Sequence, residues 1–222
     1  MKKLNHRTKV VILTVVIFLL LAAIYACGIL IPDDAITGSF LNAKQSPGFK
    51  HPFGTDALGR DLFLRTLKGL SVSITVGLAA SVISAVVAVL VGIVAATGSK
   101  RIDAVINWVI DLVMGVPHTI LIILISFSLG RGLKGLLIGI ASTHWCFLAR
   151  LIRGEVLQLR SQQYVAVSRK LGKSSGWILT HHLLPHLVPQ FIVGLILLFP
   201  HAILHEASIT FLGFGLSSES PA

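Results

Sequence analysis

Three histidines lie inside long apolar stretches of the chain, where polar side chains are costly to bury. His144 stands beside Trp145, while His201 and His205 are four residues apart and Glu206 follows them directly. A helix places residues four apart on one face, and neutral imidazoles at this spacing can share a divalent metal ion. His201 and His205 are therefore candidate ligands for a transiently bound metal ion. The candidate substrate pathway consists of His144, His201, His205 and Glu206.

The competing interpretation of these histidines is structural, with imidazoles that hydrogen-bond to backbone or water and pack neighbouring helices. We expect such a role for His118, which follows Pro117. We also expect it for His181 and His186, which lie near the end of an apolar stretch. For the other histidines the residues alone leave both interpretations open.

Two enzyme motifs are present only in part. Gly172–Ser174 matches the end of a nucleotide-binding P-loop, but Val167 stands where that motif needs its first glycine. His205 and Glu206 begin the zinc-protease pattern HExxH, but Ile209 occupies its closing position. We therefore expect no catalytic residues and no ATP bound by this chain.

Composition indicates a membrane protein. Of the 222 residues, 54% are hydrophobic and 13% are charged, against about 25% charged residues in soluble domains. A helix needs about 20 apolar residues to cross a bilayer, and five stretches approach or exceed this length. We predict an all-α, polytopic bundle of about five transmembrane helices, and an uncleaved first helix. The five stretches are Val10–Ile31, Val72–Thr97, Leu112–Gly130, Gly135–Ala149 and Leu183–His205.

The positive charge is best explained by membrane orientation. The formal net charge is +10, and the larger share of Lys and Arg falls in segments that lie inside if the N-terminus is cytoplasmic. We therefore expect a multi-pass protein with a cytoplasmic N-terminus and contacts to membrane lipid, and no nucleic-acid partner. The polar segment 32–68 would then be external, with Asp56 capping the helix after it.

The segment between the last two apolar stretches is helical in composition and is interrupted by the sequence LGKSSG. Tyr164, Val167 and Leu171 are apolar residues within this basic, water-facing segment. Such a surface is typical of a docking site for a partner. It is equally compatible with a helix that lies on lipid headgroups.

The same segment, QYVAVSRKLGKSSGWILTHHLLP, resembles the EAA loop of ABC-importer membrane subunits. The family has alanine where this chain has Val167. In that family the loop is the coupling helix that sits in a cleft of a separate ATPase. The residues that carry the resemblance, and that it makes the candidate coupling loop, are Tyr164, Val165, Val167, Ser168, Gly172, His182, Leu184 and Pro185.

Three further segments resemble the dipeptide, oligopeptide and nickel permease branch of this family: His51–Gly77, Arg101–Pro117 and Glu206–Leu216. The sequences THW, which ends at Trp145, and HAILHE, which ends at Glu206, look more like the nickel-transporting members. The resemblance therefore implies translocation of nickel or a related, possibly chelated, divalent metal ion. The alternative is a dipeptide or oligopeptide permease.

The resemblance also implies a domain organisation and a set of partners. Residues 1–69 would hold the first transmembrane helix and an extracytoplasmic segment. Residues 70–222 would be a permease domain that is C-terminally incomplete by one helix. The partners would be a second permease subunit, two ABC ATPases that bind ATP and Mg²⁺, and an extracytoplasmic binding protein, all at the bacterial cell membrane. A transporter that works alone would instead show inverted repeats or intramembrane acid–base pairs.

Overall fold

The computed structural model describes residues 5–216, which fall into two compact units. Unit 1 is residues 5–75 and unit 2 is residues 76–216. Within the described range every regular element is a helix, and the one β-type contact is an isolated bridge between Thr55 and Asp61. The predicted all-α architecture is therefore confirmed. The end of the expected permease domain lies outside the described residues.

Unit 1 contains α1 (His6–Leu30) and the start of α2 (Leu62–Thr97). Helix α1 is long and apolar enough to cross a membrane and has almost no buried side chain. It approaches α2 closely at Gly28, where a Cβ atom would lie 2.6 Å from the Cβ atom of Ser71. Lys68 also donates a hydrogen bond of 2.8 Å from Nζ to the carbonyl of Ile31. Absence of a side chain at Gly28 thus allows the two helices to meet.

The segment between α1 and α2 holds two 3₁₀ turns, Asp33–Ile36 and Phe40–Asn42, and is otherwise irregular. Asp61 accepts hydrogen bonds from the amides of Phe63 and Leu64, the pattern of a helix N-cap. The prediction that Asp56 caps this helix is therefore wrong. The carboxylate of Asp56 instead accepts from nearby amides within a turn that precedes the helix.

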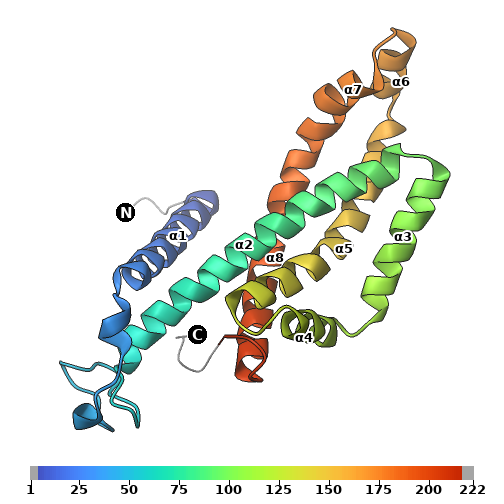
Figure 1. Cartoon of the computed structure of the whole chain (residues 1–222). Helices are drawn as coiled ribbons and strands as arrows, with labels where there is room; N and C mark the ends of the chain where they lie inside the picture. The colour runs from blue at the N-terminus through green and yellow to red at the C-terminus, as the bar shows by residue number, and fades with distance from the viewer. Residues whose placement is uncertain (1–4, 217–222) are drawn as a thin grey trace. The chain divides into compact units, whose positions relative to one another are not determined.

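Unit 2 is built around a central helix, as Figure 1 shows. Helix α5 packs against α3, α4 and α8 and is the most buried of the candidate membrane spans. Its N-terminal half also meets the second half of α2, where Ser84 Oγ donates to the carbonyl of Ala141 at 3.2 Å. The elements of this unit after α2 are α3 (Lys100–Gly115), α4 (His118–Ser128), α5 (Leu133–Arg160), α6 (Gln163–Lys170), α7 (Ser175–Ile178), the π-helical turn Leu179–Leu183 and α8 (Leu184–Phe211).

Small residues set the distances between these helices. A Cβ atom at Gly92 would lie 2.8 Å from the carbonyl oxygen of Ala149, and one at Gly194 would lie 2.7 Å from the methyl groups of Leu148. Close approach at small residues is how membrane helices gain packing energy without a hydrophobic driving force. Helix α5 therefore meets α2 and α8 at positions where this sequence has glycine.

The third predicted span, Leu112–Gly130, is not one straight helix. Helices α3 and α4 are bent by 94° at the break between them. Val116 has an extended backbone there because the residue before a proline, here Pro117, is sterically disfavoured in the helical conformation. The described residues thus hold four helices long and apolar enough to cross a membrane, or five if this bent pair forms one span.

Candidate functional site

Three histidines from three helices of unit 2 converge on one pocket. His118 is the first residue of α4, His144 lies in α5 and His205 lies in α8. The ring centroids are 4.6 Å apart for His118 and His144, 4.8 Å for His118 and His205, and 5.2 Å for His144 and His205. One ligand nitrogen from each ring can be chosen so that all three lie within 4.8 Å of one another. We call these residues the histidine triad.

The fold brings the triad together through the bend at Pro117. The break allows α4 to start beside α5 and to place His118 against His144. Helix α8 packs against both α5 and α4 and supplies His205. Sequence reasoning had given His118 a structural role, and its proximity to the other two histidines depends on the bend. The Gly–Val–Pro sequence before His118 was the visible signal of that bend.

The other predicted pathway residues have different positions. His201 is exposed and lines the same pocket, one helical turn before His205, but it is not a member of the triad. Glu206 is fully buried and does not line this pocket. Its carboxylate accepts a hydrogen bond of 3.1 Å from the hydroxyl of Thr210. The structure therefore brings His144, His201 and His205 to one cavity and directs Glu206 elsewhere.

Hydrogen bonds orient the buried member of the triad. His144 Nδ1 lies 2.9 Å from the carbonyl oxygen of Ile140, and since a carbonyl only accepts, Nδ1 carries the proton. The lone pair of the neutral ring is then on Nε2. His118 Nε2 is 3.2 Å from the same Nδ1 and 3.4 Å from the hydroxyl of Thr143. His144 is thus fixed in a tautomer that leaves one nitrogen able to bind a Lewis acid.

The pocket that holds the triad has a volume of about 260 Å³. Two sulfur-containing side chains line it, the thioether of Met114 and the thiol of Cys146. None of the residues that line it is a carboxylate. The remaining lining residues are Thr143, Phe147, Leu198 and His201.

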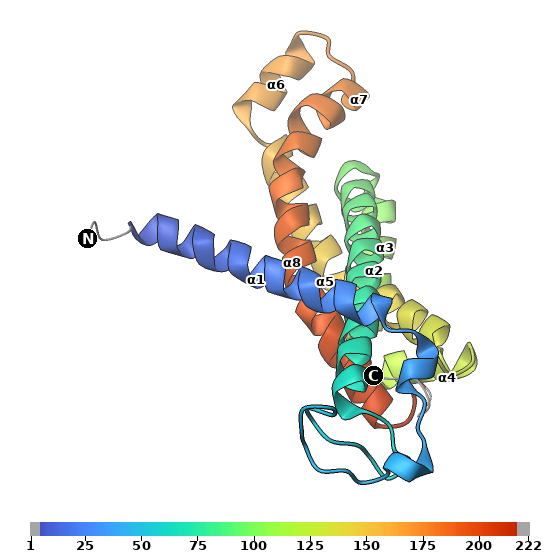
Figure 2. The ribbon, with the colours of Figure 1, turned by 90° about the vertical axis from the view of Figure 1, so that its left-hand side faces the viewer.

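The candidate coupling loop forms a helical hairpin at the end of unit 2 that is opposite to α4 (Figures 1 and 2). Gly172 connects α6 to α7 with a φ of +78°, a conformation that residues with a Cβ atom rarely adopt. Ser168 and His182 join the two sides through a contact of 2.9 Å between Oγ and Nε2. The ring of Tyr164 lies against that of His182, with centroids 5.2 Å apart.

The eight predicted loop residues divide into a buried and an exposed set. Val165 is fully buried, and Ser168 and His182 are half-buried. Four of the others are exposed: Tyr164, Val167, Gly172 and Leu184. Pro185, also exposed, lies at the start of α8, which directly follows the π-helical turn. The exposed set presents apolar surface at the tip of the unit.

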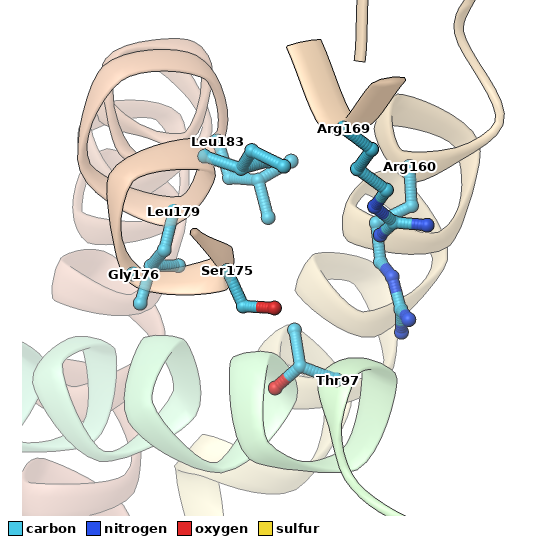
Figure 3. A pocket seen from close by; sticks show the side chains of 8 residues that line it. Thr97, Arg160, Arg169, Ser175, Gly176, Leu179 and Leu183 are labelled. Carbon is cyan, nitrogen blue, oxygen red and sulfur yellow. The ribbon is translucent and has the colours of Figure 1, made fainter. Parts of the chain in front are cut away.

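A second cavity, of about 270 Å³, lies beneath this hairpin (Figure 3). It is lined by Thr97 at the end of α2, Arg160 at the end of α5, Arg169 on α6 and Ser175 on α7. Arg160 donates a hydrogen bond from its guanidinium to the carbonyl of Ala96. That bond satisfies one of the free carbonyls at the C-terminus of α2. It ties the base of the hairpin to the helix bundle.

Fold and site together define a polytopic, all-α membrane protein with a helical hairpin at one end of unit 2 and a histidine-lined pocket. Residues 88–221 match the family described as binding-protein-dependent transport system inner membrane component. The chain belongs to this family. It is accordingly a multi-pass membrane permease component.

Several relatives are similar over nearly the whole chain, among them two from one organism. The oligopeptide transport system permease protein OppC of Bacillus subtilis (strain 168) is 34% identical over 212 residues, which are 96% of this chain and 69% of the relative. The dipeptide transport system permease protein DppC of the same strain is 34% identical over 206 residues, 93% of this chain and 64% of the relative. Both names refer to peptides, so the expected closeness to nickel-transporting members is not supported.

Proposed function

We propose that this chain is one of two membrane subunits of an ATP-driven importer of dipeptides or oligopeptides. The similarity to two peptide permeases over more than nine-tenths of the chain carries this proposal. Binding of ATP and Mg²⁺ belongs to two separate ATPase subunits. An extracytoplasmic binding protein delivers the substrate, and the second permease completes the pathway.

The hairpin of α6 and α7 is the proposed docking site for an ATPase. Leu171, at the turn, is 74% exposed, and Val167 is 54% exposed. Arg169 and Lys170 add positive charge to the last turn of α6. Apolar side chains that remain exposed beside such charges favour a protein partner.

Motion of the hairpin would reach the pathway through rigid helices. Helix α5 enters the hairpin and α8 leaves it, and both carry a triad histidine further along their length. Closure of the ATPases would move the hairpin as a unit because the contact between Ser168 and His182 joins its two sides. The two helices would then switch the pathway between outward-open and inward-open states. We propose that the hairpin faces the cytoplasm of a bacterial cell and that the N-terminus does so too, as the distribution of Lys and Arg favours.

Uptake by cells tests the proposed function. Cells that contain the complete set of transporter subunits, with or without this gene, would be given a labelled dipeptide and radiolabelled nickel in parallel. We expect loss of dipeptide uptake in the deletion strain and its return when the gene is restored. Unchanged dipeptide uptake would contradict the proposal.

A divalent metal ion, nickel or a related ion with or without a chelator, is the second candidate substrate. The specific observation that favours it is the histidine triad, since three imidazoles in one pocket are an unusual lining for a pathway that passes only peptides. In the same experiment, loss of nickel uptake with dipeptide uptake intact would select this candidate.

A further inference from the structure

We infer that His118, His144 and His205 form a binding site for a first-row divalent transition-metal ion within unit 2. The inference goes beyond peptide transport, because the site would bind a metal whether or not the metal is cargo. It rests on four properties of the triad: its geometry, its tautomer, the chemistry of its surroundings and its open side.

The geometry is close to that of a three-nitrogen metal site. Zinc-like ions bind imidazole nitrogen at about 2.0–2.1 Å, so ligands in a tetrahedral site are about 3.3 Å apart. The triad nitrogens lie within 4.8 Å of one another. Side-chain rotations that move each ligand nitrogen by about 1 Å would close this difference. His118 and His205 are only half-buried, which leaves them room for that rotation.

The tautomer of the central histidine is set by a protein acceptor. Metal-binding histidines usually donate their second ring N–H to a carbonyl or carboxylate, which orients the ring and raises the basicity of the ligand nitrogen. His144 makes this contact to the carbonyl of Ile140 at 2.9 Å. Because Ile140 and His144 are in the same helix, the acceptor remains in place without any ion.

The surroundings select the class of metal. Calcium and magnesium prefer several oxygen ligands, whereas imidazole, thiolate and thioether suit nickel, zinc, cobalt and copper. The residues that line the pocket provide nitrogen and sulfur and no carboxylate. The sulfur atoms are those of Cys146 and Met114, which line the same pocket as the histidine triad. The ligand set fits a first-row transition metal and disfavours Ca²⁺ and Mg²⁺.

Three protein ligands leave coordination positions open, as in catalytic and transport sites rather than closed structural ones. The open side of the triad faces a cavity of about 260 Å³. Water, or a carboxylate or amine of a small chelating molecule, has space to bind there.

The alternative to the triad is a metal site formed by His201 and His205, which are four residues apart on α8. A site made by His201 and His205 needs no contribution from α4 or α5. The triad instead needs one residue from each of three helices and does not need His201. Replacement of His118 therefore distinguishes the two arrangements.

The test is a Co²⁺ titration of the purified transporter complex that contains this chain, followed by the visible absorption of Co²⁺ in a nitrogen-ligand site. Isothermal titration with Ni²⁺ gives the affinity independently. We expect His118→Gln, His144→Gln and His205→Gln each to weaken binding by at least about 10-fold, as even loss of a supporting partner does at metal sites. His201→Gln should change the affinity less than 3-fold. His6→Gln, on α1 in unit 1, serves as a matched control for loss of a membrane-helix histidine.

Two results would overturn the inference. In one, wild-type complex binds no more Co²⁺ than a variant that lacks all three triad histidines. In the other, His201→Gln and His205→Gln abolish binding while His118→Gln has no effect. Gel filtration of each variant controls for folding. If His144→Gln fails to assemble, the variants at the half-buried His118 and His205 still test the inference. Dipeptide uptake is measured on the same complexes after reconstitution into proteoliposomes. Loss of metal binding alone would contradict the metal site and not the transport proposal, and loss of uptake alone would do the reverse.

Discussion

Arg153 on α5 donates two parallel hydrogen bonds to the carboxylate of Asp103 on α3, from Nε to Oδ1 and from Nη2 to Oδ2, both 2.5 Å long. Asn107, one turn along α3, donates to the same carboxylate at 2.8 Å. Both charged side chains are about one-quarter exposed. A forked contact of this kind fixes the orientation of α3 on α5 as well as contributing energy.

Replacement of Asp103 by Asn should therefore destabilise the protein. The guanidinium of Arg153 would lose its charged partner while it remains partly buried, and we expect a loss of roughly 1–3 kcal/mol. Thermal unfolding of the purified complex in detergent measures this loss. The control is Asp111→Asn, because the pair of Asp111 and Arg150 is more exposed, at 66% and 45%. That change should cost less than about 1 kcal/mol, and equal losses for the two variants would contradict the assignment.

Close packing of α2 on α5 makes a prediction at Gly92. A Cβ atom there would lie 2.8 Å from the backbone oxygen of Ala149, which cannot rotate away. We expect Gly92→Ala to destabilise the protein by roughly 1–3 kcal/mol through overpacking. Gly154→Ala is the matched control, since a Cβ atom on that α5 glycine meets nothing within 4 Å. Alanine there should be neutral or stabilising by up to about 1 kcal/mol, as melting temperatures of both variants would reveal.

The segment between α1 and α2 should lose structure in acid. Burial alone would raise the pKa of Asp61, but hydrogen bonds from the His51 side chain and from two backbone amides outweigh it and lower the pKa from its ordinary value of 3.8. A carboxyl whose pKa is lower in the folded state stabilises that state above the unfolded pKa. The stabilisation disappears as the pH falls below 3.8 through the folded value.

Amide hydrogen exchange of residues 42–64 between about pH 5 and pH 3 measures this effect, after correction for the intrinsic rates. We expect protection to decline across that range in the wild-type protein. Asn is as good an N-cap as Asp, so Asp61→Asn should keep the helix cap, but it removes the titrating carboxylate that faces His51, and protection should therefore depend less on pH. A variant with the same pH dependence as wild type would show that another group is responsible.

Exposed apolar residues of the hairpin should matter for partner binding and not for folding. Leu171→Asp introduces a charge at a side chain that is 74% exposed, so the fold should tolerate it. We expect at least a 10-fold loss of ATPase co-purification with the complex. Leu41→Asp, in the 3₁₀ turn of unit 1 where Leu41 is 94% exposed, is the control for adding an exposed charge. Unchanged ATPase binding by Leu171→Asp would place the docking surface elsewhere.

Hydropathy alone was enough to predict the all-α class, the extent of the first span and the end of the second, although α2 begins at Leu62 rather than at Val72. The stretch Val10–Ile31 lies almost wholly within α1, because an uninterrupted apolar run of that length has no other stable arrangement in a bilayer. The stretch Leu112–Gly130 was predicted less well. Its apolar composition hides a break at Val116 and Pro117, where the geometry of the X–Pro bond outweighs hydropathy.

The members of the histidine triad could not be predicted from helical periodicity alone. A period of 3.6 residues places His201 and His205 on one face of a helix, but it carries no information about which residues of other helices meet that face. His118 is distant in sequence from His205 and reaches it only because α3 and α4 are bent by 94°. The predicted cap of α2 was wrong for a similar reason: Asp56 lies in a turn that precedes the helix, and Asp61 caps it instead.

The decisive measurement is the accumulation of a labelled dipeptide in proteoliposomes that hold the two permeases and two ATPases, with the binding protein supplied outside. We expect accumulation only when this chain, ATP and Mg²⁺ are all present, and we expect the Leu171→Asp complex to accumulate at least 10-fold less. Accumulation that continues without this chain, or without ATP, would contradict its role as the membrane subunit of an ATP-driven peptide importer.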